Sequence, residues 1–408
     1  MFKTFRSSFS RRLPASLYLL TLLSLLLAQG CSLPKRLPPE PKSLLGKAQV
    51  VGMPDIRFVT LEPKDMERFA ARALELMERE KRWQVQQGQG DTLPPANLLA
   101  ISGGGDDGAF GAGLLSGWTA SGARPAFKVV TGISTGALIA PFAFLGPKYD
   151  ATLREVYTQT PPSHILQQRG LLAAVLDDAV SDNQPLLELT RKYVTPDMLR
   201  DVAAEYARGR ALLIGTVNLD ARRGVIWDMG KIASLGTPEA LELFRRLMVA
   251  SAAIPGAFPP TMIDVEVNGK RYQEMHVDGG TVSQVFIYPP RFRLKENAAS
   301  AGIQRERNLY VIRNARLDPD YVDVERQALT IVQRAISSLI HTQGIGDLRM
   351  IYEIAQRDGL DFNLAYIPQT FNAPHKENFD PGYMQALFKL GYDLGKKGYP
   401  WQKEPPYH

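Results

Sequence analysis

A strand pattern, two closely spaced glycines and a helix pattern follow one another between residues 128 and 145. Residues 128–131 contain no breaker and are rich in β-branched side chains, which predicts a short buried strand. Gly132-Ile133-Ser134-Thr135-Gly136 then fits the pattern Gly-x-Ser-x-Gly, and the small apolar residues 137–145 predict a helix. A serine in a sharp turn between a strand and a helix is typical of a nucleophile elbow. A Gly-Ser-rich turn without chemistry fits this pentapeptide equally well, so other segments must decide.

A glycine-rich loop precedes this turn. Asn97–Ile101 predicts a core strand, and a loop and a small-residue helix follow it. The loop contains Gly103, Gly104, Gly105 and Gly108, whose backbone N–H groups can converge on an anion. The spacing fits neither the dinucleotide pattern Gly-x-Gly-x-x-Gly nor the Walker pattern. Neighbouring parallel strands place their following loops at one sheet edge, so we expect the glycines to form an oxyanion hole beside Ser134.

The first thirty residues have the composition of a targeting segment. Four basic residues and no acidic ones accompany an apolar run at 17–28 that is short for a membrane span. Cys31, the single cysteine, follows small residues, and the junction resembles a bacterial lipobox. The sequence thus predicts a signal peptide at 1–30 and a lipidated Cys31 that attaches the protein to a membrane. An ordinary secretory signal and an uncleaved anchor are the alternatives. Ser32 after the cysteine favours outer-membrane sorting, so the expected location is the bacterial cell envelope.

The net charge depends strongly on this segment. The whole chain has 48 basic and 42 acidic residues, or +6, and four of the basic residues lie within 1–30. The remaining chain therefore has 44 basic and 42 acidic residues, or +2. No basic run is interleaved with stacking aromatics, so the sequence predicts no nucleic-acid surface.

The rest of the chain divides by composition. Residues 31–62 predict a proline-rich tether after the lipidated cysteine, residues 63–96 an N-terminal helix (63–87) and a linker, and residues 396–408 a tail. Between them, residues 97–395 alternate strand and helix patterns, which predicts an α/β fold with a largely parallel central sheet between helical layers. Further strands are predicted at 211–218, 225–227, 261–267, 270–277, 308–313 and 362–367, and helices at 171–180, 184–193, 196–207, 238–248, 324–339 and 384–395. Asn268-Gly269 predicts a type I′ hairpin turn.

Four motifs occur in an order that resembles the patatin-like phospholipase family. They are the loop 103–108, the Gly-x-Ser-x-Gly at 132–136, the segment Ser-Ala-x-x-Pro-x-x-Phe-x-Pro at 251–260, and Asp-Gly-Gly at 278–280. The resemblance implies a three-layer α/β/α sandwich that hydrolyses acyl esters of phospholipids or lysophospholipids without a cofactor. It also implies Ser134 as the nucleophile, Asp278 as its base, and the four loop glycines as the oxyanion hole. One position departs from the family pattern, because Asp107 stands where a basic residue is usual.

Other residues compete for these roles. His276 lies two positions before Asp278, on the same strand face, and His341 or His375 could complete a triad by chain order. No spacing typical of metal ligands is present, so no metal is expected. We expect Asp106 and Asp107 to point away from Ser134 and to stabilise the loop, since a carboxylate facing a developing oxyanion opposes catalysis. A serine esterase or thioesterase with small soluble substrates, and a non-catalytic envelope lipoprotein, are the alternative functions.

Overall fold

The computed structural model describes residues 36–90, 93–165, 167–168 and 181–406. The predicted signal peptide, Cys31 and the predicted helix at 171–180 lie outside these residues. No helix within the described ranges is long and apolar enough to cross a membrane.

Five parallel strands form one part of the central sheet. Their order is β7 (Ala211–Asn218), β4 (Val129–Ile133), β3 (Ala96–Ile101), β11 (Arg307–Arg313) and β12 (Asp361–Tyr366). Every pair of neighbours in this series runs parallel. All five positions were predicted from runs of apolar and β-branched residues, and the loops after β3 and β4 meet at one edge as expected.

Antiparallel strands extend this part into a mixed, ten-stranded sheet. β10 (Lys270–Asp278) pairs with β7 and with β9 (Thr261–Val267), β9 with β1 (Gln49–Val50), and β8 (Arg223–Asp228) with β7 and with β2 (Arg57–Val59). The β9–β10 hairpin turns at Asn268 and Gly269, whose φ values of 53° and 73° confirm the type I′ prediction. The sheet is therefore parallel in one half only.

The prediction of a free tether over residues 31–62 is wrong for its described part. β1 and β2 belong to the sheet, and a 3₁₀ helix, η1 (Lys42–Lys47), precedes them. Arg36 forms an ion pair with Asp220, and Gln273 N–H donates to Pro38 O at 3.2 Å. Strands of two or three residues are too short to show a two-residue period, so the sequence pattern did not reveal them.

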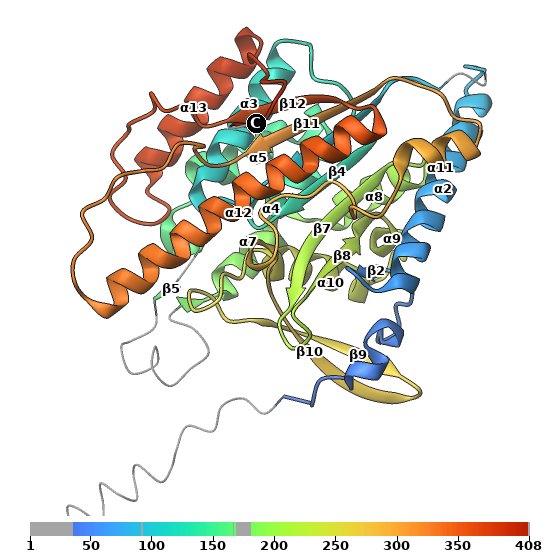
Figure 1. The fold of residues 1–408 in the computed structure, drawn as a ribbon, viewed down its shortest axis with the longest axis horizontal. Coiled ribbons are helices and arrows are strands. Elements are labelled where there is room, and N and C mark those ends of the chain that lie inside the picture. Colours follow the sequence, from blue (N-terminus) through green and yellow to red (C-terminus); the bar gives the residue numbers. More distant parts are fainter. Residues whose placement is uncertain (1–35, 91–92, 166, 169–180, 407–408) are drawn as a thin grey trace, which may run out of the picture.

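Helices cover both faces of the sheet and confirm the three-layer architecture (Figure 1). One apolar core packs α3 (Gly108–Ala120), α4 (Thr135–Leu145), α5 (Asp150–Gln159), α8 (Pro196–Ala207), α9 (Met229–Ala233), α10 (Pro238–Ser251) and α13 (Pro381–Lys397) against one face. The other core packs α2 (Pro63–Gln86), α11 (Leu294–Ser300) and α12 (Ala328–Asp358) against the opposite face. A further helix, α7 (Gln184–Tyr193), packs on α10.

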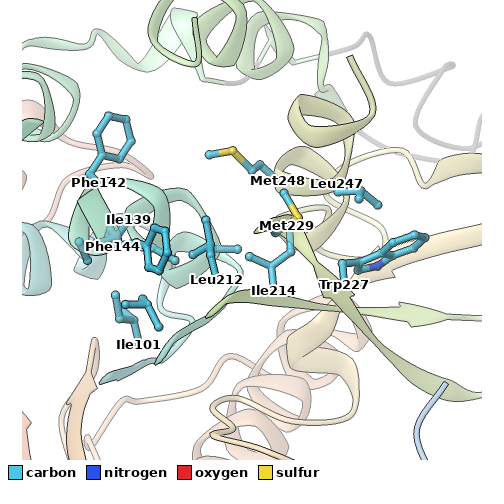
Figure 2. Close-up of a cluster of buried hydrophobic side chains, with 14 of the residues drawn as sticks. Ile101, Ile139, Phe142, Phe144, Leu212, Ile214, Trp227, Met229, Leu247 and Met248 are labelled. Carbon is cyan, nitrogen blue, oxygen red and sulfur yellow. The ribbon is translucent and has the colours of Figure 1, made fainter. Parts of the chain in front are cut away.

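Alternate residues of β3 enter alternate cores. Leu99 and Ile101 belong to the first core, and Leu98 and Ala100 belong to the second. Figure 2 shows part of the first core, where Ile101 and Leu212 of the strands approach α4.

Helix α12 differs most from its prediction. A helix was expected at 324–339, but α12 spans 31 residues from Ala328 to Asp358. Gly344 and Gly346 break the helical pattern in the sequence, because glycine disfavours helix interiors. A Cβ atom on Gly344 would lie 2.5 Å from the Arg313 side chain, so close packing explains this glycine. The second half of the helix is held by Leu348, Ile351 and Ala355 in the second core.

Candidate active site

Ser134 occupies a strained turn between β4 and α4. Its φ of 54° and ψ of −126° are unusual for a residue with a side chain. The Ser134 N–H donates to Ser251 Oγ at 3.0 Å, and the Ser251 hydroxyl donates to Gly215 O at 2.7 Å. A Cβ atom on Gly132 would overlap the Gly136 backbone. These contacts hold the turn in the geometry of a nucleophile elbow, as the sequence predicts.

Asp278 lies beside Ser134 because of how β7 is paired. Residues 211–215 of β7 pair with β4, and residues 216–218 pair with β10, while β8 occupies the opposite edge of β7 along 213–218. β4 and β10 thus follow one another along the same edge of β7. Asp278 pairs with Thr216, directly after the pair formed by Ile133 and Gly215. The nucleophile elbow and the end of β10 therefore meet, although 144 positions separate the two residues in the chain.

The Asp278 carboxyl group is buried and hydrogen-bonded. The Ser134 hydroxyl donates to it, and Gly280 N–H donates to Oδ1 at 2.7 Å. The two side chains belong to residues that are only 6% and 4% exposed. Burial raises the Asp278 pKa to about 7, even though both hydrogen bonds favour the ionised form and lower it. A carboxyl group with a pKa near neutrality can exchange a proton with a hydroxyl group more readily than an ordinary aspartate.

The four glycines of the loop have different roles. Gly103 N–H donates to Gln284 O at 3.0 Å, and Gly108 N–H donates to Gly105 O within a turn. The expectation that both act as oxyanion donors is therefore wrong, because their N–H groups are already bound. Gly104 and Gly105 have φ values of 156° and 59°, and nothing in the described chain accepts their N–H groups. A Cβ atom on Gly103 would lie 3.1 Å from the Ser134 Cβ, which places this loop against the serine.

The two aspartates of the loop are bound to the C-terminal part of the chain. The Asp106 carboxylate contacts His375 Nε2 at 2.7 Å and accepts a hydrogen bond from Phe379 N–H at 2.8 Å. The Tyr383 hydroxyl donates to Asp107 at 2.5 Å. Burial raises the Asp107 pKa to about 6, and the Tyr383 hydrogen bond acts in the opposite direction. The two carboxylates thus stabilise the loop, Asp106 through the segment before α13 and Asp107 through Tyr383 of α13, as expected.

The histidines that compete for the base are bound elsewhere. His276 Nδ1 lies 2.8 Å from Thr216 Oγ1, and its Nε2 lies 2.8 Å from Glu274, which also binds Arg57. Burial lowers the His276 pKa, which favours the neutral ring. His375 contacts Asp106, and no hydrogen bond among the described residues joins His276, His341 or His375 to Ser134. The described chain also contains no cluster of three or more side chains that could hold a metal ion.

Sequence reasoning missed several residues that support this site. Asn314 follows β11, donates to Ser102 O at 2.9 Å and accepts the Gly111 N–H at 3.0 Å. Gln284 O accepts the Gly103 N–H, and Asp347 on α12 accepts the Gln284 N–H at 2.6 Å. Asn314 directly follows a predicted strand, a position where polar residues often contribute to sites. The other two contacts depend on tertiary packing that no local pattern reports.

An apolar cavity of about 80 Å³ lies at the opposite end of the sheet. Phe69 and Met77 of α2 line it, together with Ala96 and Val129, the first residues of β3 and β4. Ser134 and Asp278 lie at the other end of these strands, so the cavity is separate from the site.

Part of the chain matches a known protein family. Residues 99–290 match the family model described as patatin-like phospholipase. A search of curated proteins gives no match. Among solved structures, VipD from Legionella pneumophila is similar at 13% sequence identity and a TM-score of 0.34, covering 75% of this chain and 66% of VipD. The present chain thus spans slightly less than two thirds of the length of VipD.

Ser134 and Asp278 both lie within residues 99–290, the part of the chain that matches the patatin-like phospholipase family model.

The raised Asp278 pKa predicts how Asp278→Asn changes stability with pH. The Asp278 pKa is about 7 in the folded chain against an ordinary value of 3.8, so its stabilising contribution is lost as the pH rises through 7. Asparagine is neutral at every pH. The free energy of unfolding of the variant should therefore rise by about 2 kcal/mol relative to that of the wild type between pH 5 and pH 8. Urea denaturation of both proteins at the two pH values measures this difference.

Asp393→Asn is a matched control, because Asp393 is exposed and its lowered pKa keeps it ionised throughout this range. A relative stability of Asp278→Asn that is the same at both pH values would contradict the raised pKa.

Proposed function

We propose that the protein hydrolyses acyl esters of phospholipids or lysophospholipids with Ser134 as the nucleophile and Asp278 as the general base. One observation carries the proposal. The Ser134 hydroxyl stands on a strained elbow and donates a hydrogen bond to a buried carboxyl group whose pKa is near 7. The patatin-like phospholipase domain supports a lipid acyl ester as the substrate.

The first half of the reaction forms an acyl-enzyme. Ser134 Oγ attacks the ester carbonyl carbon while the Asp278 carboxylate accepts the hydroxyl proton. The free N–H groups of Gly104 and Gly105 donate to the negatively charged oxygen that develops. Asp278 then returns its proton to the leaving alcohol, and the acyl group remains on Ser134.

The second half releases the fatty acid. A water molecule takes the place of the leaving alcohol, and Asp278 accepts a proton from it as it attacks the acyl carbonyl. Collapse of the second tetrahedral intermediate returns the proton to Ser134 and frees the carboxylic acid. One carboxyl group with a pKa near 7 can serve both halves, because it exists in both protonation states at neutral pH.

Two substitutions test the assignment of these roles. Ser134→Ala should abolish ester hydrolysis, and Asp278→Asn should lower kcat by about 10²- to 10⁴-fold, the usual contribution of a general base. Hydrolysis of lysophosphatidylcholine is the readout, with a short-chain p-nitrophenyl ester tested in parallel. A protein that cleaves only the soluble ester would be an esterase rather than a phospholipase.

Ser300→Ala and Asp393→Asn are matched controls at exposed positions and should keep full activity. A folded His375→Ala variant that is as inactive as Ser134→Ala would replace the dyad with a triad and contradict the mechanism.

We also propose that the mature protein is an outer-membrane lipoprotein of the bacterial envelope, attached through Cys31. The basic and apolar segments before the single cysteine, and Ser32 after it, support this attachment. Metabolic labelling with a fatty-acid analogue should modify the wild-type chain and be lost in Cys31→Ser. Label that persists in Cys31→Ser would contradict the proposal.

A further inference from the structure

Arg313 is the last residue of β11, next to the glycine-rich loop. Its two neighbours in the chain both bind Ser102, since Ile312 O accepts the Ser102 N–H at 3.0 Å and Asn314 N–H donates to Ser102 Oγ at 2.8 Å. Ser102 leads directly into Gly103, which packs against Ser134. Arg313 is thus separated from the elbow by a single strand, β3.

Two of the three guanidinium nitrogens of Arg313 are buried without hydrogen-bond partners among the described residues. The residue is 3% exposed, and neither Nε nor Nη1 has an acceptor anywhere in the described chain. The buried Arg57 differs, because both of its terminal nitrogens bind Glu274, at 2.5 and 2.7 Å, and only its Nε lacks an acceptor in the described chain. Unpaired donors of a buried cation are unfavourable, and native proteins retain them where a ligand, water or ion completes the site.

The acidic residues near Arg313 do not supply the missing acceptors. Asp347 and Asp107 act on the guanidinium electrostatically and raise its pKa, which burial lowers to about 10. One oxygen of each is bound elsewhere, Asp347 Oδ2 by Gln284 N–H and Asp107 Oδ1 by the Tyr383 hydroxyl. The charge of Arg313 is therefore partly balanced, but its Nε and Nη1 donors have no acceptor in the described chain.

Helix α12 contributes a further unpartnered nitrogen. Gly344 lies against the guanidinium, and a Cβ atom there would lie 2.5 Å from Nη2. One turn earlier on the same helix, His341 Nε2 is also buried without a partner in the described chain. Unsatisfied nitrogens thus come from two elements that pack together beside the loop.

We propose that Arg313, through its unpaired Nε or Nη1 donor, binds an oxyanion group beside Ser134, either the phosphate of the lipid substrate or the carboxylate of the released fatty acid. Hydrogen bonds from a guanidinium group to a charged oxygen are among the strong hydrogen bonds of proteins. Residues 103–108 contain two aspartates and no basic residue, so the loop itself offers no cation for such a group. The choice of ligand rests on the function proposed above.

Binding to a non-hydrolysing protein tests this subsite independently of turnover. Full-length Ser134→Ala is titrated by calorimetry with octyl phosphate, octanoate and neutral 1-O-octylglycerol, below their micelle concentrations. At least one anion should bind about 10- to 100-fold more tightly than the neutral probe, as for hydrogen bonds to a charged group. Preference for octyl phosphate assigns the subsite to the substrate, and preference for octanoate assigns it to the product.

Substitutions made in the Ser134→Ala protein connect the preference to Arg313. Arg313→Met should remove the preference for the anion. Arg326→Met is the matched control, because Arg326 is an exposed arginine on the loop before α12. Gly344→Ala should reduce the preference for the anion severalfold by displacing the guanidinium group. Gly346→Ala should leave the preference unchanged, because a Cβ atom added there would have open space around it. Gly344→Ala decides the question if Arg313→Met does not fold.

Two results would overturn the subsite: equal affinity for all three probes, or an anion preference that survives both Arg313→Met and Gly344→Ala. Failure of the proposed function would be seen separately, as wild-type protein that binds the anions but hydrolyses no ester.

Discussion

The arrangement of the site depends on one feature of strand pairing, the point along β7 at which β4 ends and β10 begins. Gly215 is the last residue of β7 that pairs with β4, and Thr216 pairs with Asp278. A shift of β10 by a single residue would turn the Asp278 side chain to the other face of the sheet. Burial of the carboxyl group, its pKa near 7 and its hydrogen bond to Ser134 all follow from this register.

Much of the support for the site lies outside residues 99–290, which match the family model. Asn314 binds the beginning of the loop and α3, and Asp347 binds the backbone at Gln284. Asp106 and Asp107 are held by residues of the segment 375–383. The strands and helices after residue 290 therefore complete the sheet and fix the loop that faces Ser134. In this chain carboxylates stabilise the loop, and the nearby buried cation, Arg313, comes from β11.

The elements that the sequence predicted well are those with strong local signals. The core strands are continuous apolar runs, the elbow is a spaced motif, and Asn268-Gly269 has the backbone conformation that its residues favour. β1 and β2 could not be predicted, because a strand of two or three residues is stabilised only by its partner. The length of α12 was missed because Gly344 is explained by a tertiary contact with Arg313.

In the candidate site, too, local motifs could be predicted from the sequence and tertiary contacts could not. Ser134 and Asp278 were identified from motifs, and the structure brings them together. The roles of the individual glycines could not be predicted, since the Gly103 N–H is bound by Gln284 O, 181 positions away in the chain. A motif indicates where N–H groups can converge, and only the tertiary hydrogen bonds show which of them remain free.

The pH dependence of covalent labelling by a fluorophosphonate tests the central claim most directly. The account predicts that the reagent modifies Ser134, identified by peptide mapping, with a rate that rises to a plateau as the pH passes about 7, where Asp278 ionises. In Asp278→Asn the labelling should be slow and should lose this ionisation. Modification of a different residue, or an unchanged pH profile in folded Asp278→Asn, would contradict the assignment of Asp278 as the base of Ser134.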